Sequence, residues 1–250
     1  MEFYDLVLIG ASFFSLGAAY ECKGRSLIID SKAKPGYEFI DAFYNGEAYD
    51  RPIKTPKGRA FAQYFKQSGL LDTVYIPEWT PYLSRWICEN EIDMLFFTSV
   101  LSVDKEGEYS KITLYNTMGK QEILARRIID TRTEEFTEKQ LNGLVCGGKV
   151  KAFGPSIKVK EFEKISLVEF TVPENYSYTQ ARAHIFKIWE GRPEQYQSVK
   201  IAAIADQFFK RPALEKRVVS DSIWHYYSAF YDNPLLAFDK GCEIGGVCCD

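Results

Sequence analysis

The chain has 250 residues, with 31 Lys and Arg against 34 Asp and Glu, so its formal net charge is −3. This near balance argues against a nucleic-acid binder that works through its overall charge. Hydrophobic residues make up 46% and charged residues 26%, which is typical of a soluble globular protein and excludes a disordered or fibrous chain.

The most apolar window, Leu6 to Tyr20, lies near the N-terminus. It is shorter than the about 18 to 20 apolar residues that a membrane span requires. A secretory signal would begin with basic residues, whereas Glu2 and Asp5 are acidic and the first basic residue is Lys23. We therefore expect a cytoplasmic protein without a membrane segment.

The first 30 residues have the pattern of a β-α-β unit. Leu6–Ile9 is a continuous apolar run of strand length, typical of a strand buried on both faces of a parallel sheet. After Gly10, the small and apolar residues of Phe13–Glu21 predict a buried helix. A second buried strand, Ser26–Ile29, then leads to Asp30. The connection is expected to be a right-handed crossover between parallel strands.

Further elements follow a turn-rich stretch from Ser31 to Pro56, and together they indicate a mixed α/β fold. Helices are predicted over residues 58–69, 178–190, 194–210 and 216–230. Strands are predicted over residues 94–103, 111–116 and 126–130, with one or two more over 156–172. Composition shifts toward Gly and Lys around residues 143–155. We expect a Rossmann-like dinucleotide-binding domain over 1–150 and a smaller region over 151–250 with a helical C-terminal part.

The turn between the first strand and the first helix carries the clearest functional signal. In a dinucleotide site, the first glycine permits the tight turn, the second position lets the backbone approach a pyrophosphate, and the third lets helix and strand pack closely. Gly10 keeps the first role, and Ser12 and Ser15 take the other two. Asp30 would accept a hydrogen bond from a ribose hydroxyl. The alternative is a closely packed β-α-β unit that merely has small residues at its turn.

Two segments, Tyr4 to Glu21 (YDLVLIGASFFSLGAAYE) and Ser26 to Gly36 (SLIIDSKAKPG), resemble the opening of the FAD-dependent oxidoreductases of the glutathione-reductase structural type. Ile92 to Val103 is similar to that family's strand with a late adenine-contacting valine. Ala125 to Thr133 (ARRIIDTRT) resembles a later segment that passes near the cofactor. The resemblance implies FAD as cofactor and a Rossmann-like parallel sheet. The implied cofactor-binding residues are Gly10, Ala11, Ser12, Phe13, Phe14, Ser15, Asp30, Ser31, Val100, Thr131 and Arg132.

The sequence also departs from the family pattern. Thr131-Arg132-Thr133 follows Asp130 where the family has a small glycine. A second family fingerprint, a strand that ends in Gly-Asp and holds the ribityl chain, has only Leu235 to Asp239 (LLAFD) as its nearest copy. The chain is also shorter than a complete family member.

The histidines suggest no metal motif, and the cysteines fall into two groups. His184 and His225 lie in aromatic, helix-like settings too far apart for a metal motif. Cys22, Cys88 and Cys146 are scattered, as expected of buried thiols. Cys242, Cys248 and Cys249 crowd the segment Gly241 to Asp250, which is expected to be a frayed tail or, alternatively, a thiol or soft-metal site.

The preferred hypothesis is a small FAD-dependent oxidoreductase that acts on a small-molecule substrate, without nucleic-acid or membrane partners. One alternative is a flavin-free descendant of the fold that serves as a binding or partner subunit, its pocket closed by Phe13, Phe14 and Arg132. Another is a nicotinamide-nucleotide binder. The sequence leaves the catalytic residues, the substrate, the electron acceptor and the oligomeric state open.

Overall fold

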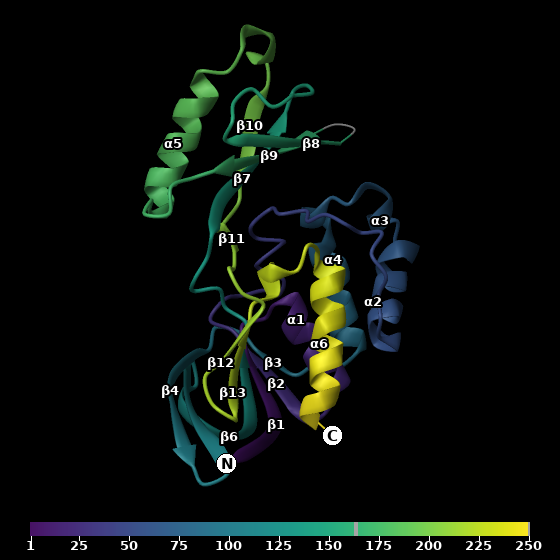
Figure 1. Cartoon of the computed structure of the whole chain (residues 1–250), viewed down its shortest axis with the longest axis vertical. Coiled ribbons are helices and arrows are strands. Elements are labelled where there is room, and N and C mark those ends of the chain that lie inside the picture. Colours follow the sequence, from purple (N-terminus) through teal and green to yellow (C-terminus); the bar gives the residue numbers. More distant parts are fainter. Residues whose placement is uncertain (163–164, 250) are drawn as a thin grey trace.

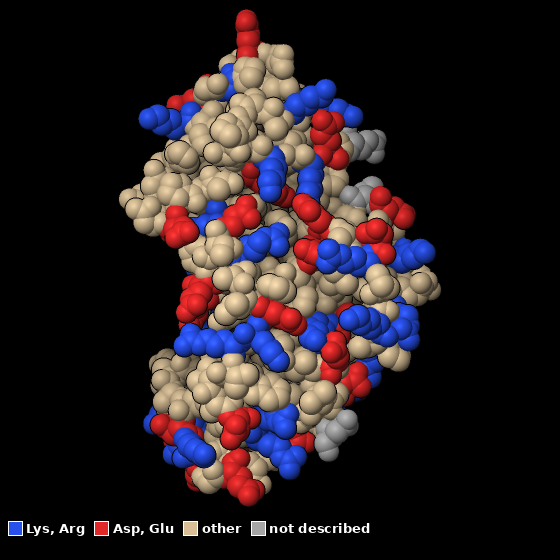
Figure 2. All heavy atoms as spheres, in the orientation of Figure 1, with Lys and Arg blue, Asp and Glu red and all other residues tan. Residues whose placement is uncertain are grey.

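The computed structural model describes residues 1–162 and 165–249. In this part of the chain, two β-sheets occupy opposite ends of an elongated molecule, and helices cover one side of each (Figure 1). Basic and acidic side chains are interspersed over the face drawn in Figure 2, in keeping with the balanced charge.

The first sheet has the strand order β12-β13-β6-β1-β2-β3, and a β4–β5 hairpin adds to the beginning of β6. Its strands are β1 (Glu2–Ile9), β2 (Ser26–Ile29), β3 (Met94–Leu95), β4 (Ser99–Glu106), β5 (Tyr109–Asn116), β6 (Gly119–Asp130), β12 (Lys216–Val218) and β13 (Ile223–Tyr226). β1 runs parallel to both β2 and β6, and β13 runs parallel to β6. The predicted parallel sheet with its β-α-β unit is confirmed.

Helices pack on one face of this sheet and form the largest hydrophobic core. They are α1 (Phe13–Glu21), α2 (Pro56–Gln67), α3 (Leu70–Thr73), α4 (Trp79–Glu89) and α6 (Pro234–Cys249). Aromatic side chains fill the space between them: Phe61 stacks on Phe238 with ring centroids 3.8 Å apart, and Phe65 stacks on Trp79 at 4.3 Å. Much of the aromatic content of the sequence is therefore core packing.

The second sheet is antiparallel and has the order β10-β7-β9-β8, with β11 also paired to β7. Its strands are β7 (Glu138–Cys146), β8 (Ile157–Glu161), β9 (Ile165–Thr171), β10 (Lys200–Ile204) and β11 (Phe209–Arg211). α5 (Tyr178–Glu190) packs on this sheet through Ala181, Ile185 and Trp189. The helix over 178–190 and the strands within 156–172 are confirmed, except that residues 163–164 lie outside the described part.

The chain passes from the first sheet into the second and then returns to the first. β7 lies before residue 150 yet belongs to the second sheet, and β12, β13 and α6 return to the first. The division into 1–150 and 151–250 stays a prediction about domains.

Two predicted helices are wrong. Residues 194–210 form a single 3-10 turn (Glu194–Tyr196) followed by β10 and β11, and residues 216–230 form β12, β13 and a 3-10 turn (Ser228–Phe230). β11 pairs with β7, and β13 pairs with β6. These tertiary pairings override the helical periodicity of the aromatic residues in both segments.

The C-terminal segment also differs from expectation. Leu235 to Asp239 lies in α6 rather than in a strand, and the expected frayed tail up to Cys249 is the rest of that helix; Asp250 lies outside the described residues. Asn233 begins α6, since its side-chain Oδ1 accepts a hydrogen bond from the Leu236 N–H at 3.0 Å. An Asn-Pro pair at a helix start is a signal that sequence inspection could have used.

α6 crosses α1 at very short range. A Cβ placed on Gly241 would lie 2.0 Å from the Phe14 carbonyl oxygen, and one on Gly17 would lie 2.0 Å from the Phe238 carbonyl oxygen. A disulfide then joins Cys22, at the end of α1, to Cys249 at the end of α6. The expectation of a free thiol at Cys22 is therefore wrong. None of the helices in the described residues is both long and apolar enough to span a membrane.

Candidate functional site

Gly10 makes the tight turn from β1 into α1. Its φ of +97° lies in the left-handed region, which favours glycine. A Cβ at this position would lie 2.8 Å from Thr131 Oγ1 and 3.0 Å from the Tyr37 hydroxyl. Both the backbone angle and the close neighbours therefore require glycine here.

Asp30 follows β2 and turns its carboxylate toward this turn. Asp30 Oδ2 accepts a hydrogen bond from the Ala11 N–H at 2.6 Å, and Oδ1 accepts one from the Lys32 N–H at 2.8 Å. A carboxylate offers about four acceptor positions, so about two remain for a ligand. Asp30 is thus fixed by the backbone and still able to accept hydrogen bonds from hydroxyl groups.

The two serines of the turn point into the protein. Ser12 caps α1, because its Oγ accepts the Ser15 N–H at 3.1 Å, and it donates to Thr131 Oγ1 at 2.9 Å. The Ser15 hydroxyl donates to the Gly10 carbonyl oxygen at 2.6 Å. Ser12 and Ser15 are fully buried and Thr131 is nearly so. This hydroxyl cluster ties the turn to the end of β6.

Phe13 and Phe14 are core residues. Phe13 packs edge-on against Phe39, with ring centroids 5.8 Å apart, and Phe14 stacks on Tyr226 at 4.9 Å. Both are fully buried. Their side chains therefore do not close a pocket, as the flavin-free alternative assumed, although their backbone N–H groups lie at the start of α1.

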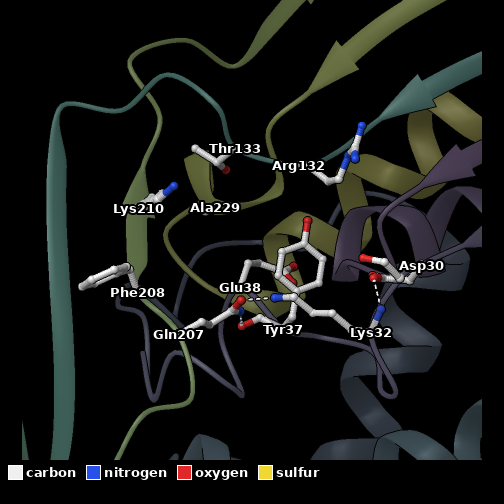
Figure 3. Close-up of a pocket in the computed structure, with 11 residues that line it drawn as sticks. Asp30, Lys32, Tyr37, Glu38, Arg132, Thr133, Gln207, Phe208, Lys210 and Ala229 are labelled. Atoms are coloured by element: carbon white, nitrogen blue, oxygen red, sulfur yellow. Dashed lines mark hydrogen bonds between the residues drawn. The ribbon is translucent and has the colours of Figure 1, made fainter. Parts of the chain in front are cut away.

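Two hollows flank Arg132 at this end of the sheet. The Val100 hollow, of about 200 Å³, lies between the ends of β1 and β2 and is lined by Gly10, Asp30, Ser31, Thr98, Val100 and Arg132, among others. The Tyr37 cleft, of about 290 Å³, shares Asp30, Ser31 and Arg132 with it and extends to Gln207, Phe208 and Lys210 on the way into β11 (Figure 3). The cleft therefore lies where the two sheets meet.

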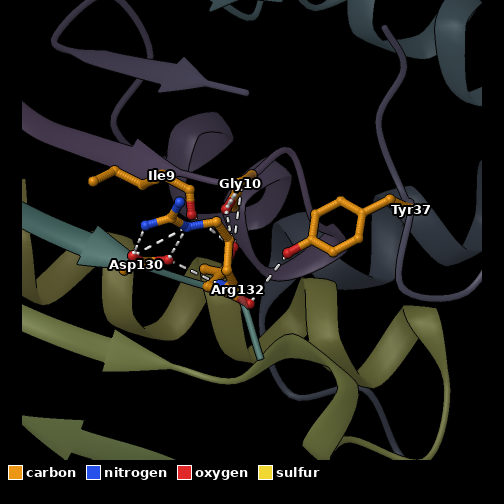
Figure 4. Close-up of polar contacts among 7 residues, drawn as sticks. Ile9, Gly10, Tyr37, Asp130 and Arg132 are labelled. Atoms are coloured by element: carbon orange, nitrogen blue, oxygen red, sulfur yellow. Dashed lines mark hydrogen bonds and ion pairs between the residues drawn. The ribbon is translucent and has the colours of Figure 1, made fainter. Parts of the chain in front are cut away.

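Arg132 is held beside Gly10 by an ion pair. Its Nη2 lies 2.6 Å from Asp130 Oδ2, and its backbone N–H donates to Asp130 Oδ1 at 3.0 Å (Figure 4). The hydrogen bond to Asp130 raises the pKa of Arg132, so the guanidinium stays charged. Arg132 therefore forms the wall between the two hollows.

Glu38 approaches the start of α1 from the loop after β2. Glu38 Oε1 accepts hydrogen bonds from the Phe13 N–H at 2.8 Å and from the Ser228 hydroxyl at 2.6 Å. Ser228 Oγ in turn accepts the Phe14 N–H at 3.3 Å. Burial raises the pKa of Glu38 from its ordinary 4.5 to about 7. An acidic group thus sits at the positive end of α1, in the floor of the Tyr37 cleft.

Lys32 and Tyr37 form another wall of the cleft. The Lys32 ammonium lies 4.3 Å from the centre of the Tyr37 ring and donates to Gln207 Oε1. Burial lowers the pKa of Lys32. The Tyr37 hydroxyl donates to the Thr131 carbonyl oxygen at 3.3 Å, above Gly10.

The structure brings most of the sequence-predicted residues to one place. Gly10, Asp30, Ser31, Val100 and Arg132 line the hollows, while Ala11 donates to Asp30 and the remaining residues lie beneath the turn. Sequence inspection missed the residues that complete the cleft, among them Lys32, Tyr37, Glu38, Gln207 and Lys210, and it missed Ser228, which donates to Glu38. For Glu38, the one local signal was an acidic residue that directly precedes the apolar pair Phe39-Ile40 after a Pro-Gly turn.

The Leu235 to Asp239 segment contributes nothing to these hollows. Asp239 Oδ1 accepts hydrogen bonds from the Thr55 N–H and hydroxyl, at 2.8 Å and 2.6 Å. It therefore secures the start of α2. The strand that leads to the site is β13, whose continuation carries Ser228.

No family model and no curated protein matches the sequence. Solved structures similar to the chain include a flavoprotein/dehydrogenase from Cytophaga hutchinsonii (14% identity, TM-score 0.60, 99% of this chain and 78% of that one) and a flavin-dependent brominase (12%, 0.63, 99% and 79%). A geranylgeranyl bacteriochlorophyll reductase-like protein from Thermoplasma acidophilum is similar to the same degree (12%, 0.63, 100% and 78%). The chain therefore has the Rossmann-like fold of flavoprotein oxidoreductases.

Proposed function

We propose that the protein is a FAD-dependent oxidoreductase of the glutathione-reductase structural type that acts on a small-molecule substrate. The observation that carries the proposal is the arrangement around Gly10. A glycine turn leads into the N-terminus of α1, and an acidic residue at the end of the next strand faces a hollow beside it. This is the geometry that holds the adenosine half of a dinucleotide.

The described residues fit the adenosine half. Asp30 retains unused acceptor positions for ribose hydroxyls, and the backbone around Val100 lines the hollow where an adenine would lie. Gly10 makes the turn beside this hollow, and Arg132 offers a positive charge next to it. Ser31 lines the same hollow.

Where the diphosphate would lie, at the start of α1, the chain already places the carboxyl group of Glu38. Glu38 Oε2 is buried, and no hydrogen-bond partner for it is found in residues 1–162 and 165–249. A carboxylate oxygen without a partner at a helix N-terminus marks a place suited to negative charge. The site therefore fits the diphosphate when the Glu38 side chain moves away from the start of α1.

Bound FAD would supply the hydride or electron chemistry. The chain's own residues bind and orient: Asp30 and Arg132 hold the nucleotide, and the Tyr37 cleft admits the substrate between the two sheets. Lys32 Nζ lies in the cleft wall, where it can donate a hydrogen bond to a bound group, and burial lowers its pKa.

A visible spectrum after incubation with FAD and removal of free cofactor tests the proposal. We expect bands at about 370 and 450 nm, a property of the oxidised flavin itself. Gly10→Ala should lose them, because its Cβ would contact Thr131 Oγ1. Gly24→Ala is the matched control, since Gly24 also has a positive φ of +77° but no atom within 4 Å of its Cβ position. A wild-type protein that stays colourless contradicts the proposal.

A flavin-free binding or partner subunit is the second candidate. The observation that favours it is the saturation of the first turn of α1, whose N–H groups are all accepted by side chains of the same chain. The same spectrum distinguishes the two candidates.

A further inference from the structure

The start of α1 can bind an anion through the backbone N–H groups of its first turn, and we call these N–H groups the anion seat. The helix is nine residues long, and the N–H groups of Phe13, Phe14 and Ser15 have no carbonyl partner within it. Glu38 Oε1, Ser228 Oγ and Ser12 Oγ accept these three N–H groups in turn. Of the three acceptors, Glu38 alone can carry a negative charge, which is the kind of group that a helix N-terminus favours.

Glu38 is poorly satisfied in this seat. Its residue is 5% exposed, and within the described part of the chain its Oε2 has no hydrogen-bond partner. Lys32 is the basic group whose charge acts on it most, yet the Lys32 ammonium is hydrogen-bonded to Gln207. Arg132 is paired with Asp130. Burying a carboxylate that has one unpartnered oxygen and no paired cation costs free energy.

The Glu38 side chain borders a cavity, and its backbone is anchored by the residues that follow it. Phe39 and Ile40, which follow Glu38, are buried in the core and anchor the segment. Glu38 itself borders the Tyr37 cleft of about 290 Å³. A change of side-chain rotamer would carry the carboxylate from the start of α1 into this cleft.

We propose that Glu38 is an internal occupant of the anion seat and that the diphosphate of a nucleotide ligand competes with it for the N-terminus of α1. The inference rests on the proposed function, because it assumes that the Val100 hollow takes the adenosine half. The inference goes beyond the proposed function because it assigns to Glu38 the control of how tightly the diphosphate half binds. The ligand class that this control affects is adenosine carrying a diphosphate, and adenosine alone escapes it.

The test is calorimetric titration of the full chain with ADP and, separately, with adenosine. Glu38→Ala should tighten ADP binding about tenfold or more, because the seat is vacated, and leave adenosine binding unchanged. Glu38→Asp should act in the same direction, because a shorter side chain withdraws the carboxylate from the Phe13 N–H. Glu38→Gln should stay within about threefold of wild type, since its amide oxygen can accept the same two hydrogen bonds.

Glu169→Gln provides a matched control. Glu169 is also buried, at 3% exposed, and burial raises its pKa too, but it lies on β9 in the second sheet. It should leave both affinities unchanged. Circular dichroism of each variant confirms that the fold is retained.

The outcomes separate this inference from the proposed function. Tighter ADP binding in Glu38→Ala supports the inference even if no variant acquires flavin bands, in which case the proposed function alone fails. Equal or weaker ADP binding in Glu38→Ala and Glu38→Asp overturns the inference, even if the wild type takes up FAD. If neither ADP nor adenosine binds any of the folded proteins, both are overturned.

Discussion

The two ends of α1 are held in different ways. At the N-terminal end, side-chain acceptors from distant segments occupy the free N–H groups, and one of them borders a cleft. At the C-terminal end, glycine-mediated backbone contact with α6 and the Cys22–Cys249 disulfide leave no comparable freedom. The C-terminal end is therefore fixed, whereas the side-chain acceptors at the N-terminal end are, under the inference above, exchangeable.

The largest expected effect comes from disturbing the fixed end. Gly245→Ala places a Cβ 2.6 Å from the Ala18 carbonyl oxygen, so α1 and α6 must separate. We expect the free energy of unfolding to fall by about 3 kcal/mol or more. Gly246→Ala is the control in the same helix, because the nearest atom to its Cβ position is 3.8 Å away. Urea unfolding measures both, and equal stability of the two variants would contradict the close crossing.

The disulfide is the second restraint at the fixed end. Cys249→Ala should lower the free energy of unfolding by about 2 to 3 kcal/mol, because the unfolded chain regains the freedom that the cross-link removes. Cys88→Ala is the comparison, since Cys88 is a free, exposed thiol. Reducing agent should destabilise the wild type and leave Cys249→Ala unchanged; an equal response of the two proteins would argue that the bond does not form.

The exchangeable end should show itself in the pH dependence of stability. Burial raises the pKa of Glu38 to about 7 in the fold, so between pH 4.5 and about 7 the folded state binds more protons than the unfolded state. Stability contributed by this group is therefore present at low pH and lost as the pH rises through that window, by on the order of 2 kcal/mol. Glu38→Gln should remove this slope. The unfolding free energies of wild type and Glu38→Gln are measured from pH 4.5 to 8, and their difference should change with pH. Two parallel curves would show that Glu38 does not titrate in this range.

The smallest effect is expected at the Val100 hollow. Asp30→Asn removes one of the two carboxylate acceptors that fix the Ala11 and Lys32 N–H groups. A loss of about 1 kcal/mol in stability follows. Adenosine binding should weaken about tenfold or more, since a hydrogen bond to a carboxylate contributes roughly 1.5 kcal/mol or more and about 1.4 kcal/mol is a tenfold change in affinity. Asp93→Asn, at an exposed position before β3, should change neither stability nor affinity.

The sequence predicted one side of the site well and the other hardly at all. Leu6–Ile9, Gly10 and Asp30 belong to a local pattern in which burial, turn geometry and strand end are all set by neighbouring residues. Glu38 and Ser228 meet across 190 residues of chain, and no local pattern records that pairing. The strands over 200–204 and 223–226 escaped prediction for the same reason, because β7 and β6 supply their partners.

The Cys22–Cys249 bond spans a separation of 227 residues in a chain of 250, so that all but short ends of the polypeptide form one covalent ring. A single proteolytic cut anywhere in that ring, for example in the outer antiparallel sheet, opens the ring without releasing a fragment. The cut protein would migrate as one band on a non-reducing gel and as two on a reducing gel. The second sheet is thus tethered to the first sheet from both directions, and a single cut in its backbone does not detach it.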